Sequence, residues 1–328
     1  MSSEILVDIA MGTYNHEGFI AQALESVLSQ ETDFPYRIII CDDFSTDNTR
    51  SIIMSYVEQY PGKIITVFPD KHFGLMHRDR PYPKVLKQCT AKYIAMLEGD
   101  DYWTDPNKLQ KQVDLLERNP EIAGCFSNAI IVDDDGNMVS DDYFDYFKVK
   151  VKPEIRTADI VPFGISPCNT LLFRRAILIN PPDWFARNIR HSGFDLLITL
   201  HGILYCINEK LGAYRIHAGG VWSLSKLSFR LMTDLLFLKP MCRDIYMHDH
   251  YGSVIREVIR QTIFRLLECK SQEEGSGKIA ANLVKFIFAY PRCISFFILI
   301  PFWIFRYYEI KLRCSAIIGI KKIISGDR

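Results

Sequence analysis

Short apolar runs alternate with amphipathic segments along the first 120 residues of the chain. Four runs are almost continuously apolar, as expected for buried strands: Ile5–Met11, Arg37–Cys41, Ile64–Phe68 and Tyr93–Leu97. Between them, apolar residues recur at helical spacing, as in Ile20, Ala23, Leu24, Val27 and Leu28. Strands of this kind that alternate with helices are typical of a mostly parallel sheet with helices on both faces. We therefore predict an α/β fold built on such a sheet.

Polar side chains follow three of these strands. Thr13-Tyr14-Asn15 comes after the first strand, Asp42-Asp43 after the second, and Glu98-Gly99-Asp100-Asp101 after the fourth. The carboxyl ends of parallel strands lie at one edge of a sheet, where ligands bind in folds of this class. One crevice is therefore expected to collect all three groups.

The acidic group after the fourth strand allows two interpretations. Carboxylates so close together repel one another, and they need a cation or hydrogen bonds to remain ionised. A divalent ion held by one or two carboxylates and by the phosphates of a nucleotide would supply that charge. Alternatively, the group is a solvated turn before a helix, with Asp105 as the N-cap and Pro106 in the first helical position. These residues alone leave both interpretations open.

After residue 120 the regular alternation of apolar strands and amphipathic helices ends. Ile122–Val132 is expected to form a long strand, and the three aspartates from Asp133 to Asp135 the tip of a hairpin rather than a metal site. Residues 141–156 are acidic and aromatic without a clear period, which indicates a mobile loop. Asp195 follows Gly193-Phe194 at the start of an expected helix, where an aspartate is ordinarily an N-cap or a first-turn residue. His217 lies in the segment Tyr214–Ser223, which is expected to be rich in turns and where a lone histidine is either structural or a ligand.

Composition narrows the class of protein. Lys and Arg number 39 and Asp and Glu number 39, so the chain has no net positive charge that would favour binding nucleic acid. The nine cysteines show no Cys-x-x-Cys spacing, which fits a reducing compartment rather than a disulfide or zinc framework. The N-terminus carries no basic, apolar signal segment. We therefore expect the body of the protein to be cytoplasmic.

The C-terminal third differs from the body. We expect residues 225–270 to be helical and to pack on the preceding domain, residues 271–278 to be a linker, and residues 279–328 to form a separate tail. The tail is apolar and aromatic, and its charged residues are mostly basic: Lys285, Arg292, Arg306, Lys311, Arg313, Lys321, Lys322 and Arg328, against Glu309 and Asp327. Arginines and prolines interrupt the run of roughly 20 apolar residues that a spanning helix needs. Peripheral association with an anionic membrane surface is favoured, and a buried helix covering the sheet is the alternative.

Three motifs stand in one order along this chain: Thr13-Tyr14-Asn15, then Asp42-Asp43-x-Ser45-Thr46-Asp47-x-Thr49, then Glu98-Gly99-Asp100-Asp101-Tyr102-Trp103. Together they resemble the family 2 inverting glycosyltransferases, which have the GT-A fold. The resemblance covers about residues 5 to 225. It implies a GT-A domain over residues 1–224, with a nucleotide-sugar half at about 1–120 and an acceptor half at about 121–224.

The resemblance implies a role for several residues around the nucleotide. Tyr14, with Thr13 beside it, would pack on the base, and Asp42 or Asp43 would read the base edge. Glu98-Gly99-Asp100 falls where the family has Asp-x-Asp, with Glu98 in place of the usual first aspartate. Arg78 or Arg80 would meet the diphosphate.

The resemblance also implies the metal and the base. Asp100 and Asp101 are the candidates for binding Mn²⁺ or Mg²⁺, and the sequence does not say which of them touches the ion. His217, within Tyr-Arg-Ile-His, resembles a late histidine that can complete the metal or diphosphate site. Asp195 falls where members of the family carry the catalytic base.

The expected activity is inverting transfer of a sugar, most simply from a UDP-sugar, to a hydroxyl of a glycan or a lipid-linked acceptor in bacterial cell-surface polysaccharide biosynthesis. The enzyme would be associated peripherally with the inner face of the cell membrane. A non-catalytic, membrane-associated protein that binds nucleotide sugars is the alternative. A phosphoryl-accepting receiver domain would be much shorter, and a dinucleotide dehydrogenase would need a Gly-x-Gly-x-x-Gly after the first strand, which is absent here.

Overall fold

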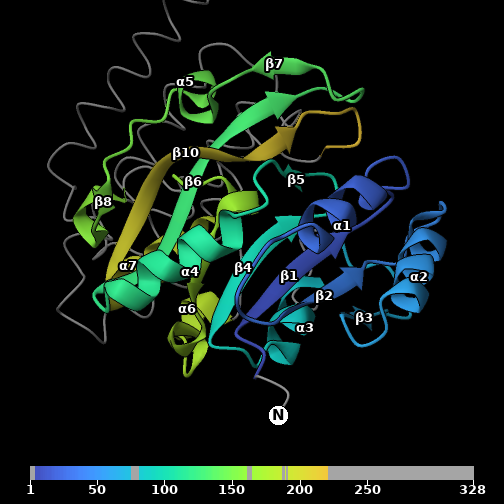
Figure 1. The fold of residues 1–328 in the computed structure, drawn as a ribbon, viewed down its shortest axis with the longest axis horizontal. Coiled ribbons are helices and arrows are strands. Elements are labelled where there is room, and N and C mark those ends of the chain that lie inside the picture. The colour runs from blue at the N-terminus through green and yellow to red at the C-terminus, as the bar shows by residue number, and fades with distance from the viewer. Residues whose placement is uncertain (1–3, 75–80, 161–164, 187–188, 190, 221–328) are drawn as a thin grey trace, which may run out of the picture. The chain divides into compact units, whose positions relative to one another are not determined.

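Four parallel strands form one half of the central sheet (Figure 1). In the computed structural model, which describes residues 4–74, 81–160, 165–186, 189 and 191–220, they lie in the order β3-β2-β1-β4. Their bounds are β1 Val7–Thr13, β2 Tyr36–Asp42, β3 Ile64–Val67 and β4 Tyr93–Glu98. In the register of this half, Met11 of β1 lies beside Ile40 of β2 and Leu97 of β4. The predicted strands and their parallel pairing are confirmed here.

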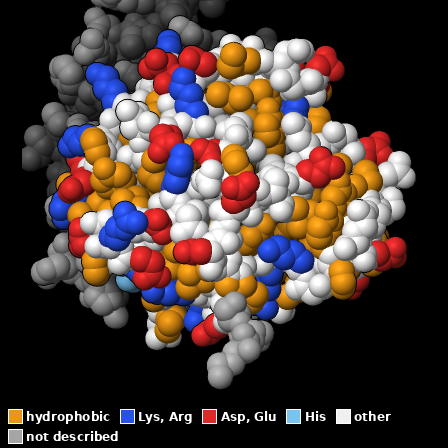
Figure 2. All heavy atoms as spheres, viewed as in Figure 1, with side chains coloured by type: hydrophobic (Ala, Val, Ile, Leu, Met, Phe, Trp, Pro, Cys, Tyr) orange, Lys and Arg blue, Asp and Glu red, His pale blue; other side chains and the backbone are white. Residues whose placement is uncertain are grey.

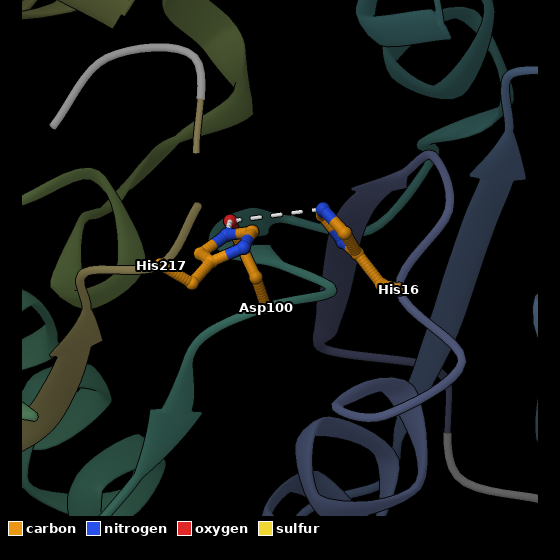
Figure 3. A group of neighbouring side chains, drawn as sticks. All are labelled: His16, Asp100 and His217. Atoms are coloured by element: carbon orange, nitrogen blue, oxygen red, sulfur yellow. Dashed lines mark hydrogen bonds and ion pairs between the residues drawn. The ribbon is translucent and has the colours of Figure 1, made fainter. Parts of the chain in front are cut away.

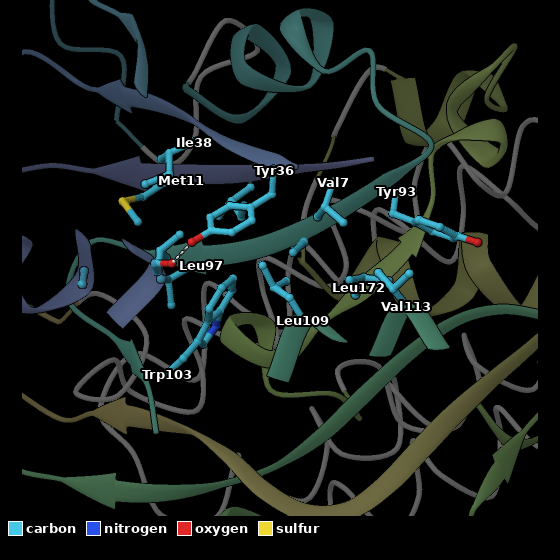
Figure 4. Packing of buried hydrophobic residues seen from close by; sticks show 14 of the residues in the cluster. Val7, Met11, Tyr36, Ile38, Tyr93, Leu97, Trp103, Leu109, Val113 and Leu172 are labelled. Atoms are coloured by element: carbon cyan, nitrogen blue, oxygen red, sulfur yellow. Dashed lines mark hydrogen bonds between the residues drawn. The ribbon is translucent and has the colours of Figure 1, made fainter. Parts of the chain in front are cut away.

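Helices cover both faces of this half, as predicted. On one face, Val7, Ile9 and Met11 of β1 pack in a common core with α1 (Ile20–Leu28) and α4 (Lys108–Arg118); Figure 4 shows part of this packing. On the other face lies α3 (Pro81–Gln88), since a Cβ on Gly12 would lie 3.4 Å from the ring of Tyr82. Helix α2 (Thr49–Gln59) packs beside α1. Alternate residues of each strand therefore face different helices.

The other half of the sheet is mixed. Strand β9 (Leu172–Arg174) is antiparallel to both of its neighbours, β4 and β6 (Ile122–Val132), whereas β10 (Ile203–Arg215) is parallel to β6. The short strands β5 (Tyr102–Trp103), β7 (Met138–Ser140) and β8 (Glu154–Ile155) are antiparallel to their partners. The prediction of a mostly parallel sheet is thus wrong for this half. An apolar run such as Leu171–Phe173 is buried on both faces whichever way it points, so its composition does not reveal direction.

The remaining elements are short. They are α5 (Tyr143–Phe147), α6 (Asp183–Ala186), α7 (His191–His201) and the 3₁₀ turns η1 (Thr157–Asp159), η2 (Cys168–Thr170) and η3 (Arg175–Leu178). The predicted hairpin tip is confirmed, because Asp133 accepts hydrogen bonds from the backbone N–H groups of Asp135 and Asn137 between β6 and β7.

Three local predictions are wrong. Residues 141–156 contain α5 and β8 rather than one structureless loop. Helix α4 begins at Lys108 with Asn107 at its N-cap, and the Asp105 carboxylate accepts from the backbone N–H of Asn107 just before the helix. The third concerns Tyr214 and Arg215, which belong to β10 rather than to a turn.

The predictions for Arg78, Arg80 and all residues after 220 lie outside the described part of the chain. This includes the helical segment 225–270, the linker 271–278 and the tail 279–328. Among the residues that the structure describes, no helix has the length and apolar character to cross a membrane. On the face drawn in Figure 2, acidic and basic side chains are interspersed over the described surface.

A lysine is buried where α4 packs on the sheet. Lys108 is fully buried, and its Nζ lies 3.9 Å from the centroid of the Trp103 ring and donates a 2.6 Å hydrogen bond to Gln112 Oε1. Burial lowers the pKa of Lys108 to about 7, because the ammonium loses its hydration. The contact with the Trp103 ring and the hydrogen bond to Gln112 offset only part of the free energy that burial of the ammonium requires.

This burial predicts a pH-dependent stability. Between about pH 7 and the ordinary lysine pKa of 10.5 the unfolded chain keeps a proton that the folded chain has released. Stability therefore rises with pH in this window, by up to about 1.4 kcal/mol per pH unit from this group. We expect Lys108→Met to lose this part of the slope in denaturant titrations from pH 7 to 9. The control variant Lys111→Met, at a partly exposed lysine of the same helix, should keep it, and equal slopes in both variants would exclude Lys108 as the source.

Candidate active site

The ends of β1 and β4 are brought together by a glycine. The backbone N–H of Gly99 donates a 2.9 Å hydrogen bond to the Gly12 carbonyl, and a Cβ on Gly99 would lie only 2.6 Å from Thr13 Oγ1. No other residue fits at position 99 without displacing Thr13. The chain after β4 can therefore turn directly over the end of β1, which places Asp100 beside the loop that carries His16.

Asp100 lies between two histidines from distant parts of the sequence (Figure 3). His217, two residues after β10, donates from Nε2 to Asp100 Oδ2 at 3.0 Å, and His16 Nε2 lies 3.7 Å from the same oxygen. His16 Nδ1 shares a 3.2 Å hydrogen bond with Thr13 Oγ1, which leaves Nε2 directed at the carboxylate. The exposed fractions of the His16, Asp100 and His217 side chains are only 14%, 19% and 4%.

The charges in this cluster depend on one another. Burial alone would raise the pKa of Asp100, but the hydrogen bond from His217 and the nearby His16 outweigh it, so the pKa of Asp100 is lowered and the carboxylate is ionised. Burial lowers the pKa of His16 despite the attraction of Asp100. His16 is therefore a neutral imidazole with a lone pair available at physiological pH.

Asp101 contacts the end of β10. Its Oδ1 accepts a 2.8 Å hydrogen bond from the backbone N–H of Arg215, and its side chain is buried. Burial and the neighbouring carboxylates of Asp100 and Glu98 raise the pKa of Asp101 well above its ordinary value. Asp101 is thus placed to hold the end of β10 against the turn formed by Gly99, Asp100 and Asp101, which we call the acidic turn.

Arg215 holds the same turn from the other side. Its guanidinium donates to the Asp100 carbonyl at 3.0 Å, to the Asp133 carbonyl at 2.8 Å and to Gln22 Oε1 at 2.6 Å. It also lies 4.8 Å from the centroid of the Phe19 ring. This single cation ties the acidic turn to α1 and to the β6–β7 hairpin, and so fixes the position of His217 two residues later.

The two aspartates at the end of β2, Asp42 in the strand and Asp43 just after it, have different surroundings. Asp42 is fully buried and accepts hydrogen bonds from Ser45 and from Arg50 Nε, the latter at 3.0 Å. Asp43 accepts from the backbone N–H groups of Phe73 and Gly74, at 3.1 and 2.9 Å. Asp42 therefore holds its own loop together, whereas Asp43 shapes the segment after β3.

Tyr14 forms an exposed aromatic surface next to Asp43. Its ring is 37% exposed and lies 4.2 Å, centroid to centroid, from the ring of His72. His72 Nδ1 lies 3.1 Å from Asp43 Oδ2 and 3.0 Å from the Asp43 carbonyl oxygen. A flat ligand group could stack on this surface.

Glu98 ends β4 and meets α3. Tyr82 donates a 2.9 Å hydrogen bond from its hydroxyl to Glu98 Oε1, and its hydroxyl lies 4.0 Å from Cys168 Sγ. Glu98 thus lies between α3 and the η2 turn.

Asp195 has a different position from the one predicted. It is the fifth residue of α7, which begins at His191, and it is fully buried. Its Oδ2 accepts from the backbone N–H groups of Ile165 and Ser166 at 2.8 and 3.1 Å, and its Oδ1 accepts from Ser166 Oγ at 2.5 Å. The interpretation as an N-cap or first-turn residue is wrong. Its role as a base stays a prediction.

The structure brings together part of the predicted set. Thr13, Asp100 and His217 lie around His16, Asp101 contacts the backbone of Arg215, and Tyr14 and Asp43 both lie against His72. Sequence reasoning missed three residues: His16, Tyr82 and Arg215. A signal existed for His16, since it follows Thr13-Tyr14-Asn15 on the same strand-end loop; for Tyr82 the sequence offered none.

The cluster fits a divalent metal ion. One ligand atom from each of His16, Asp100 and His217 lies within 4.8 Å of the others. Asp100 Oδ1 is buried without a hydrogen-bond partner among the described residues, which leaves a carboxylate oxygen available for a cation. Two imidazoles and a carboxylate are donors that divalent transition metals accept.

Comparison with known proteins identifies related chains. The family model described as glycosyl transferase family 2 matches residues 8–178. The putative teichuronic acid biosynthesis glycosyltransferase TuaG of Bacillus subtilis is 32% identical over 248 residues, covering 71% of this chain and 91% of TuaG. An uncharacterized protein of Mycobacterium tuberculosis is 31% identical over 217 residues, 64% of this chain, and the chain spans only 58% of the length of that relative.

A solved structure has the same fold at low sequence identity. The crystal structure of residues 1–349 of S. aureus TarS in complex with UDP-GlcNAc superimposes with a TM-score of 0.64 and 17% identity, covering 88% of this chain and 82% of that one. The extent of the family match, together with the identity to TuaG, is decisive. The chain is a member of glycosyl transferase family 2, with an α/β GT-A-like fold and a mixed central sheet.

Proposed function

We propose that this protein transfers a sugar, with inversion, from a UDP-sugar to a hydroxyl of a glycan or lipid-linked acceptor in bacterial cell-surface polysaccharide biosynthesis. The observation that carries the proposal is the half-buried Asp100 between His16 and His217 at the carboxyl edge of the sheet. The name of TuaG, which refers to teichuronic acid biosynthesis, and the UDP-GlcNAc bound to TarS support the substrate classes.

Asp100, His217 and His16 would hold the ion, Mn²⁺ or Mg²⁺. A bound divalent ion neutralises charge on the diphosphate of the donor and on the leaving group. Asp101 is not part of this ligand set in the proposal, because its Oδ1 is directed at the Arg215 backbone. It would act by keeping the turn and His217 in place.

The nucleotide would lie along the edge from β2 to β4. Its base would stack on Tyr14, with Asp43 and the segment it holds at the base edge. Thr13 would act through its hydrogen bond to His16, and Glu98, held by Tyr82, would face the ribose. Asp42 would support this loop from inside the protein rather than contact the base.

The acceptor and location complete the proposal. The basic, aromatic stretch at residues 279–328 would bring the enzyme to the anionic inner face of the cell membrane, where lipid-linked sugars are presented. Only the sequence supports this part of the proposal.

A donor panel tests the activity. We expect the full-length protein to bind and slowly hydrolyse one of a set of UDP-, GDP- and dTDP-sugars, in a metal-dependent way. Asp100→Asn should lower the hydrolysis rate by about 10²-fold or more, because it removes the charge that holds the ion. The matched control is Asp114→Asn on α4, which should not change the rate. Folded protein that binds no donor with Mn²⁺ present would support the non-catalytic alternative.

The histidines predict a preference among metals. Mg²⁺ favours oxygen ligands, whereas Mn²⁺, Co²⁺ and Zn²⁺ accept imidazole more readily. We expect His16→Asn to weaken Mn²⁺ binding by about tenfold or more and Mg²⁺ binding by less, measured by titration calorimetry with UDP present.

His201→Asn changes an exposed histidine of α7 outside the cluster and is the control for the metal titration. Equal Mn²⁺ affinity in the His16 variant, the control and the wild type would exclude His16 as a ligand.

A further inference from the structure

Helix α7 holds a chain segment that reaches into the candidate active site. Asp195 accepts three hydrogen bonds from Ile165 and Ser166, through two backbone N–H groups and one hydroxyl. Ionised carboxylates that accept backbone N–H groups make strong, directional contacts. The start of the segment 165–170 is therefore fixed to the second turn of α7.

The other end of this segment contacts three elements of the site. The Asn169 carbonyl accepts a 2.6 Å hydrogen bond from Trp103 Nε1, and Asn169 Nδ2 donates to the Ala213 carbonyl at 2.8 Å. Cys168 Sγ lies 4.0 Å from the Tyr82 hydroxyl that binds Glu98.

These contacts connect the segment to the two parts of the chain that carry Asp100 and His217. Trp103 lies two residues after Asp101, at the end of the acidic turn. Ala213 lies on β10, and His217 follows the end of that strand. The segment thus spans from α7 to the acidic turn on one side and to the histidine-bearing end of β10 on the other.

The surroundings of Asp195 differ from those of a general base. A base must come within about 2.6–3.2 Å of the hydroxyl whose proton it takes, directly or through one water. Asp195 is fully buried, and its two oxygens are covered by the backbone and hydroxyl of residues 165 and 166. An acceptor hydroxyl would have to displace these donors to reach it.

We propose that Asp195 is a positioning residue: it holds the segment 165–170 so that Asn169 fixes Trp103 and the end of β10, and through them Asp100 and His217. The proposal rests on the glycosyl transfer proposed above and replaces the role of base that the resemblance implies for Asp195. If Asp195 is a positioning residue, a different group takes the proton of the acceptor hydroxyl.

Two substitutions of Asp195 distinguish positioning from base catalysis. An asparagine can still accept both backbone N–H groups through Oδ1 and can donate from Nδ2 to the Ser166 hydroxyl, whereas an alanine can make none of these contacts. We therefore expect Asp195→Asn to reduce kcat by less than about tenfold. Asp195→Ala, which leaves the segment unheld, should reduce kcat by about 10²-fold, since small misplacements at a site have such effects.

The pH profile and Mn²⁺ affinity provide readouts that a purely structural role would not change. The fall of kcat/KM at low pH should remain in Asp195→Asn, because the group whose protonation causes it is not Asp195. Asp195→Ala should weaken Mn²⁺ binding several-fold, and Asp195→Asn should not. Ser166→Ala removes only the hydroxyl contact and is expected to lie between the two variants.

Two results would overturn the proposal. Equal loss of turnover in both Asp195 variants, with the fall of kcat/KM at low pH gone and Mn²⁺ binding intact, would make Asp195 the base. A lower melting temperature of Asp195→Ala with unchanged turnover and Mn²⁺ affinity of the folded protein would make its role purely structural. The Mn²⁺ measurement is independent of transfer, so it remains decisive if wild-type protein turns over no donor and the proposed function fails.

Discussion

The negative charge of the half-buried Asp100 carboxylate is only partly compensated by its surroundings, because its neighbour His16 is a neutral imidazole. Asp100 stays ionised because His217 donates to it and because His16 is near, yet one of its oxygens is buried without a hydrogen-bond partner among the described residues. Such an arrangement costs stability unless a cation completes it. Much of the surrounding structure can be understood as keeping this carboxylate in place while leaving one side of it available.

The residues that support Asp100 come from parts of the described chain that are distant in sequence. Gly99 allows the turn to lie directly on Thr13, and Thr13 orients His16. Arg215 holds the turn from β10, with Asp101 accepting its backbone N–H. The segment 165–170 holds Trp103 and Ala213 and is itself held by Asp195. The site is therefore held by polar contacts between elements that are distant in sequence, as preorganised electrostatic sites are.

The sequence predicted the first half of the fold better than the second. Apolar runs and helical spacing located the four parallel strands, and local polar motifs placed Thr13 and Asp100 at one edge. Strand direction after residue 120 depends on how the chain returns to the sheet. The composition of an apolar run such as β9 does not indicate that direction. The role of Asp195 depends likewise on Ile165 and Ser166, which are about 30 residues away, so its own surroundings in the sequence predicted a helix start instead.

The location of bound Mn²⁺ would show whether Asp100 and the two histidines form the metal site. Crystals of the full-length protein grown with UDP and Mn²⁺ can be measured at the manganese absorption edge, where anomalous scattering identifies the ion. We expect one strong peak within coordination distance of His16 Nε2, His217 Nε2 and an oxygen of Asp100. A peak bound by Asp101 and distant from both histidines, or a nucleotide complex without a peak at this edge of the sheet, would contradict this expectation.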